Sequence, residues 1–261
     1  MTALPQAAFF LLLEAAVGGS IALLWLDLQG QVPIGFTRFT GACFLVFGAL
    51  AIWLRSSFPP VESGGLFFQS ERVLTFAFVV LLAVYLISQR FRRIIGPLTP
   101  LVGLAAIWAA SLVVSSPQLG GLGVALAVLA GAVALGSALT ALSLGHWYLV
   151  SPTLATQPLI RVNFLCLGAI VAQLILLPIL LFGPGTTPQS RNTLFNDDAL
   201  FLGVRIVFGL LVPLAASVMA WRTARIRSLD SATGLLYIVA ALVLAGEITA
   251  RTLFFLTGVA T

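Results

Sequence analysis

Long apolar stretches alternate with short polar breaks along the whole chain of 261 residues. Eight of these stretches are long enough to cross about 30 Å of hydrocarbon as helices that rise about 1.5 Å per residue. Backbone polar groups need partners in lipid, so the pattern predicts an all-α bundle of eight transmembrane helices. We expect these helices at residues 6–28, 36–54, 72–88, 97–114, 121–150, 159–182, 200–221 and 231–257.

The composition supports this assignment. Hydrophobic residues make up 60% of the chain and charged residues 8%, which is typical of a multi-pass membrane protein. All 13 basic residues are arginines, but they form no basic stripe, so we exclude a nucleic-acid partner. We expect a protein of the inner (cytoplasmic) cell membrane, in contact with membrane lipids.

The arginines also orient the predicted bundle. Three follow the third span and three follow the seventh, whereas the connection between the fourth and fifth spans has no charge. By the positive-inside rule both basic loops are cytoplasmic, which places both termini outside. Residues 183–199 then lie outside as a solvated loop or as a docking segment. The six arginines are Arg90, Arg92, Arg93, Arg222, Arg225 and Arg227.

The two halves of the chain match each other at sequence shifts that change only between spans. We therefore predict one integral membrane domain with a four-plus-four repeat in the same topology, divided into residues 1–118 and 119–261. The matched positions are Gly19 and Gly136, Ser20 and Ser137, Arg38 and Arg161, Cys43 and Cys166, Arg72 and Arg205, and Arg92 and Arg225.

Ionisable side chains inside the predicted spans are candidates for function, because charge is costly at bilayer depth. Glu247 and Arg251 are four residues apart, so they share one helix face and can neutralise each other. Glu71 is expected with Arg72 at the outer start of the third span. The outer half can hold a quinone or proton site, or structural ion pairs that fix helix register. The candidates are Glu14, Arg72, Arg205, Glu247 and Arg251.

A second candidate site lies at the cytoplasmic end of the fifth span, around the only histidine of the chain. Histidine titrates near neutral pH or ligates metals, whereas Trp and Tyr prefer the membrane interface. An aromatic belt and an inner-leaflet site both fit this pattern. Its residues are His146, Trp147, Tyr148 and Arg161.

Residue counts argue against several cofactors. One histidine and two methionines do not supply the paired axial ligands of a transmembrane b haem within one chain. Cys43 and Cys166 are far apart in sequence and fit small core residues better than metal ligands. No nucleotide-binding or serine hydrolase motif is present. We expect no metal and no cofactor bound covalently or by a clear motif, while quinone and lipid remain candidate ligands.

Residues 246–255 read Gly-Glu-Ile-Thr-Ala-Arg-Thr-Leu-Phe-Phe. They resemble the Gly-Glu, Arg, Leu-Phe-Tyr pattern near the end of the membrane anchors of DMSO reductase and polysulfide reductase type enzymes, the NrfD-like superfamily. The resemblance departs at Phe255, where tyrosine is usual, and the histidine of the family's second span has no counterpart. It implies an eight-helix anchor without haem that binds quinone near the outer face, beside an iron-sulfur subunit, with Glu247 and Arg251 in the terminal motif.

The leading hypothesis is therefore a cofactor-free membrane subunit of a respiratory-type redox complex. Such a subunit contributes a quinone or proton site and anchors other subunits, and is at most a non-catalytic or quinone-binding part of an oxidoreductase. A secondary transporter is an alternative, because intramembrane charges and internal repeats occur there too. A scaffold that holds lipid or pigment is a third hypothesis.

Overall fold

A computed structural model describes residues 3–60, 65–88, 92–114, 121–151, 153–183 and 186–261. Its regular elements are all helical over the described residues. Eight helical spans in this part of the chain are long and apolar enough to cross a membrane. The elements are α1 (Ala3–Leu28), α2 (Ile34–Ser57), α3 (Leu66–Ile87), α4 (Arg92–Val114), α5 (Gly121–Val150), α6 (Gln157–Phe182), α7 (Pro188–Asn196), α8 (Ala199–Ile206), the π-helical turn η1 (Val207–Leu211), α9 (Val212–Arg225) and α10 (Leu229–Thr257).

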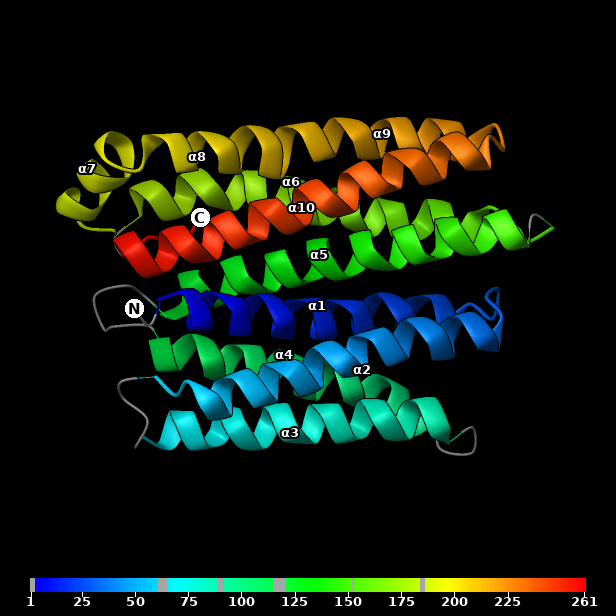
Figure 1. The fold of residues 1–261 in the computed structure, drawn as a ribbon, viewed down its shortest axis with the longest axis horizontal. Coiled ribbons are helices and arrows are strands. Elements are labelled where there is room, and N and C mark those ends of the chain that lie inside the picture. The colour runs from blue at the N-terminus through cyan, green and yellow to red at the C-terminus, as the bar shows by residue number, and fades with distance from the viewer. Residues whose placement is uncertain (1–2, 61–64, 89–91, 115–120, 152, 184–185) are drawn as a thin grey trace.

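The long helices lie side by side along one axis, with α1 and α5 in the middle of the bundle (Figure 1). Helices α2, α3 and α4 lie on one side of this pair, and α6, α8, α9 and α10 on the other. Both termini and α7 lie at one end, which we name the terminal end. The first turn of α4 and the last turn of α9 lie at the opposite end, which we name the basic end.

The same neighbours recur in the two halves. Helix α1 packs on α2 as α5 packs on α6, and α3 packs on α4 as the continuous η1–α9 segment packs on α10. Between the halves, α1 contacts α10 and α4 contacts α5. A parallel duplication produces this set of neighbours, and the repeat itself stays a prediction from the sequence.

Several helix boundaries differ from the sequence-based expectation, such as the start of α4 at Arg92 instead of residue 97. Two of the differences bear on the candidate site. Helix α3 begins at Leu66, so Glu71 and Arg72 lie in its second turn and not at the start of the span. Helix α2 continues to Ser57, so it includes Arg55. Both extensions have one cause, because Arg55 and Glu71 neutralise each other across the two helices and neither charge ends its helix.

The connection at residues 183–199, where the sequence left a solvated loop and a docking segment open, includes a short helix in its described part. It contains α7, whose first turn begins with Pro188 after the cap residue Thr187. The Thr187 hydroxyl accepts a hydrogen bond from the Ser190 backbone N–H at 3.1 Å. Leu194 is buried, so it anchors this short helix to the bundle.

Cys43 also differs from the expectation. Its side chain is exposed, while Cys166 is buried in the core as expected. Because the side chain of Cys43 is exposed on α2, it does not serve as a core residue. Arg90 lies outside the described residues.

The predicted orientation can be tested by cysteine accessibility. Arg93 in α4 and Gln189 in α7 are both exposed and lie at opposite ends of the bundle. In a chain with both native cysteines replaced by alanine, we expect Arg93→Cys to be blocked in intact cells and Gln189→Cys to react with a membrane-impermeant maleimide. Equal reactivity at both positions, or reaction at position 93 alone, would show the orientation to be wrong.

Candidate functional site

Four ionisable side chains form a continuous series of ion pairs inside the bundle. The Arg251 Nε lies 2.7 Å from Glu14 Oε1, and its Nη2 lies 3.2 Å from Glu247 Oε2. The other oxygen of Glu247, Oε1, accepts Arg205 Nη1 at 3.2 Å. We name the series Glu14, Arg251, Glu247 and Arg205 the ion chain. The prediction that Glu247 and Arg251 face the interior and pair with each other is confirmed.

The ion chain is sealed from its surroundings, since no member's side chain is more than 2% exposed. Its two acids and two bases cancel in charge, as buried groups require. Arg205 Nη2 donates to Gln173 Oε1 of α6 at 2.5 Å. Arg251 Nη2 donates to the Ala127 carbonyl oxygen of α5 at 3.3 Å. The ion chain therefore joins α1 of the first half to four elements of the second.

Local geometry explains how α10 presents two of these groups. A spacing of four residues places Glu247 and Arg251 on one face of the helix. Gly131 of α5 faces them, and a Cβ at this position would lie 2.5 Å from Glu247 Oε2. The missing side chain at Gly131 therefore makes the room that the carboxylate occupies.

The cavity beside the ion chain is small. It measures about 10 Å³ and is lined in part by Gln173, Arg205 and Thr261. Three donors near it have no hydrogen-bond partner among the described residues, namely Gln173 Nε2, Arg205 Nε and Thr261 Oγ1. This space fits one water molecule and excludes a quinone ring.

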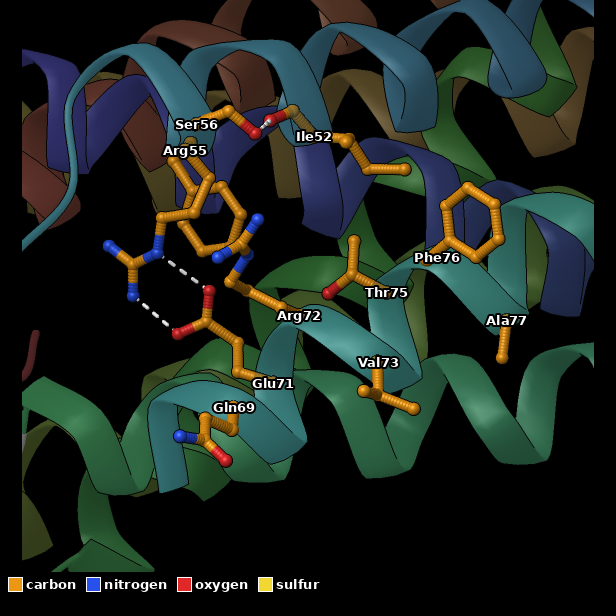
Figure 2. A pocket seen from close by; sticks show the side chains of 11 residues that line it. Ile52, Arg55, Ser56, Gln69, Glu71, Arg72, Val73, Thr75, Phe76 and Ala77 are labelled. Carbon is orange, nitrogen blue, oxygen red and sulfur yellow. Dashed lines mark hydrogen bonds and ion pairs between the residues drawn. The ribbon is translucent and has the colours of Figure 1, made fainter. Parts of the chain in front are cut away.

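A second polar site lies at the terminal end between α2 and α3. The Arg55 guanidinium binds the Glu71 carboxylate through two contacts, Nε to Oε1 at 2.6 Å and Nη2 to Oε2 at 2.5 Å (Figure 2). Its Nη1 donates to Gln6 Oε1 of α1. The guanidinium also lies over the Phe9 ring at 4.3 Å. This buried pair is fixed by a bidentate contact and by two groups of α1.

The Arg55–Glu71 pair forms one wall of a cavity of about 550 Å³, which we name the Arg55–Glu71 pocket. Arg72 is exposed at this pocket. The Thr75 hydroxyl is buried and has no hydrogen-bond partner within the described part of the chain. The remaining lining combines aromatic, aliphatic and small polar side chains, as Figure 2 shows: Phe9, Ile52, Ser56, Gln69, Val73, Phe76 and Ala77.

The structure thus divides the predicted outer set between two places. Glu14, Arg205, Glu247 and Arg251 form the ion chain. Arg72 lies away from it, in the Arg55–Glu71 pocket. Sequence reasoning missed Arg55 because the second span was expected to end just before it. A single arginine directly after a long apolar stretch was the available signal.

The residues of the predicted second site point in different directions. His146 is exposed, and its Nδ1 lies 3.4 Å from the Tyr237 hydroxyl. Trp147 packs edge-on against Phe36, with ring centroids 5.9 Å apart. These two neighbouring side chains therefore contact different helices.

Tyr148 and Arg161, the other two residues of the predicted second site, make hydrogen bonds to different groups. Tyr148 is buried, and its hydroxyl donates to the Ala155 carbonyl oxygen. Arg161 Nη1 donates to Gln29 Oε1 at 2.5 Å. The four side chains at this end do not converge on one ligand position.

Among the described residues, no group of three or more His, Cys, Asp or Glu side chains is placed to hold a metal ion. Comparison of the chain with models of protein families, with curated proteins and with solved structures finds no match. The fold defines the class of this protein, which is an all-α, multi-pass membrane protein. Its function is therefore argued from the ion chain and the Arg55–Glu71 pocket.

Proposed function

We propose that this protein is a cofactor-free membrane subunit of a respiratory-type redox complex, and that a quinone head group binds in the Arg55–Glu71 pocket. The observation that supports this most is the pocket itself, with a volume of about 550 Å³ and polar groups on one wall. Electrons would come from partner subunits at the terminal end. The resemblance of residues 246–255 to NrfD-like membrane anchors belongs to the same proposal.

The chemistry of the pocket suits a quinone. A carbonyl oxygen that gains negative charge on reduction needs a cation or a hydrogen-bond donor. Arg72 supplies a guanidinium that is not paired with any carboxylate among the described residues. The unpaired hydroxyl of Thr75 offers a second hydrogen bond. The ring would pack against Phe76, and the apolar tail would leave past exposed Val73 toward lipid.

The ion chain has a different role in this proposal. Its adjoining cavity has room for one water molecule and none for a quinone, and its charges cancel. We assign it to fixing the two halves of the bundle against each other. A secondary transporter would need a path for substrate past these charges, and their complete burial favours the fixed arrangement.

A scaffold is the second candidate, and the exposed position of His146 favours it. An exposed imidazole at the surface of a bundle can ligate the metal of a pigment held by a neighbouring subunit. Purification in mild detergent separates the candidates. Iron-sulfur partners are expected for the redox subunit, and pigment is expected for the scaffold.

Quinone binding is tested with Thr75→Val and Arg72→Gln, using titration of a short-chain quinone into the purified complex. We expect Thr75→Val to weaken binding roughly five-fold, because about 1 kcal/mol is lost with one neutral hydrogen bond. Arg72→Gln should weaken it by roughly ten-fold or more, because hydrogen bonds to charged groups are stronger.

The matched control is Thr40→Val. Thr40 is also a buried helical threonine without a hydrogen-bond partner among the described residues, but it lies outside the pocket. Its replacement should leave quinone affinity unchanged. If the quinone does not bind, or if all three variants bind it like the native protein, the pocket is not a quinone site and the redox proposal loses its main support.

A further inference from the structure

A separate groove lies near the basic end of the bundle, between α2 and α3. Its volume is about 440 Å³, and aliphatic side chains with a single arginine line it. Figure 1 shows these two helices together on one side of the bundle. Three lining residues, Arg38, Ala42 and Ile87, are exposed, so in a bilayer the groove would open to lipid. The lining residues are Arg38, Ala42, Leu45, Ala83, Leu86 and Ile87.

Arg38 is the unusual member of this set. It lies four residues after the start of α2 at Ile34, about 6 Å along the helix axis. Its side chain is exposed and makes no hydrogen bond or ion pair with any described residue. An unpaired guanidinium at this depth on a lipid-facing surface is costly unless a counter-ion reaches it.

Two other arginines near this end bind protein groups. Arg92 pairs with Asp27 at 2.5 Å. Arg161, which the sequence repeat matches to Arg38, donates to Gln29 at 2.5 Å. Of these three arginines, only Arg38 makes no hydrogen bond or ion pair with a described residue. Its N–H groups can therefore donate to a ligand. Phosphate oxygens accept from a guanidinium with good geometry.

We propose that this groove binds an anionic phospholipid, with the head-group phosphate on Arg38 and an acyl chain along the groove. The small side chains Ala42 and Ala83 leave the space that the chain fills, and Leu45 and Leu86 supply aliphatic contacts. A phospholipid that bears a choline cation is disfavoured, because that cation lies close to the guanidinium. This inference stands apart from the proposed quinone site, which lies at the other end of α2 and α3.

The test is native mass spectrometry of the delipidated full-length protein, titrated with phosphatidylglycerol or with phosphatidylcholine. We expect the native protein to retain phosphatidylglycerol preferentially. Arg38→Gln should lower this affinity roughly five-fold, since one cation near an anionic head group contributes about 1 kcal/mol.

Arg93→Gln is the matched control. Arg93 is an exposed arginine at the same end of the bundle, and it does not line the groove. The two variants therefore lose the same charge, but Arg93→Gln should change the affinity less than two-fold. Equal losses for both variants would show a general surface-charge effect and would overturn the site.

A second variant tests the acyl-chain contact. Ala42 is exposed, so Ala42→Leu can fill the groove without disturbing the core. It should lower phosphatidylglycerol affinity although Arg38 is retained, and inorganic phosphate should not compete for the site. Binding unaffected by Ala42→Leu but abolished by inorganic phosphate would identify a phosphate site and overturn the lipid assignment. Equal affinity for phosphatidylcholine would overturn it as well.

Discussion

Replacing Arg251 by methionine is expected to lower the free energy of unfolding by about 3–5 kcal/mol, the usual cost of removing one partner from a buried ion pair. Methionine keeps most of the apolar length of the arginine stem, so the loss of charge dominates. Glu14 is fully buried and has its closest cation in Arg251, 2.7 Å away. The substitution strands this carboxylate. Unfolding in detergent, followed by tryptophan fluorescence, measures the loss.

The order of groups in the ion chain predicts which second substitution rescues this variant. Adding Glu14→Gln removes the stranded carboxylate and leaves Glu247 paired with Arg205 at 3.2 Å. We therefore expect the double variant Glu14→Gln/Arg251→Met to regain at least half of the lost stability. The double variant Glu247→Gln/Arg251→Met should regain none, because it leaves Glu14 without its cation and Arg205 without its anion. Equal stability of the two double variants would contradict the connectivity.

Part of this site follows from the sequence alone. The spacing of Glu247 and Arg251 predicts their shared helix face, and the cost of charge in lipid predicts that they point inward. The sequence also predicts that Glu14 and Arg205 lie in the same outer half. It does not predict that Arg251 lies closer to Glu14 than to Glu247, at 2.7 Å against 3.2 Å. The distance between Arg251 and Glu14 depends on how α1 packs against α10.

The Arg55–Glu71 pocket could not be predicted because a charged residue near the end of an apolar stretch usually marks the end of a span. Here each charge is neutralised by the other, so both helices continue past them. The prediction that His146, Trp147 and Tyr148 form one site was wrong for a different reason. Consecutive residues on a helix point about 100° apart, so neighbours in sequence face different surroundings.

The contact between α1 and α5 leads to the second large effect. A Cβ added at Gly136 of α5 would lie 2.0 Å from the backbone carbonyl carbon of Gly18 in α1. A Cβ at Gly18 would lie 1.7 Å from the Ala132 carbonyl oxygen. Both obstacles are backbone atoms, which no side-chain rotation can move away. The two central helices can approach this closely only because both positions are glycine.

We therefore expect Gly136→Ala to destabilise the protein by about 3 kcal/mol or more, at the upper end of overpacking costs, because α1 and α5 must separate. Gly168→Ala is the matched control, since a Cβ at Gly168 of α6 meets no atom within 4 Å. It should change stability by no more than about 1 kcal/mol, the difference in helix propensity between glycine and alanine. Thermal unfolding of both variants in the same detergent measures the difference, and a similar small effect at both positions would contradict the close approach.

Gly136→Ala should also weaken an ion pair of the ion chain. Glu14 lies one helical turn before Gly18 on α1, so a shift of α1 away from α5 also moves its carboxylate relative to Arg251. In the Gly136→Ala background, Glu14→Gln should therefore cost less stability than it does in the native chain, because its ion pair is already weakened. An undiminished cost of Glu14→Gln in that background would mean that the glycine contact and the ion chain hold the two halves together independently.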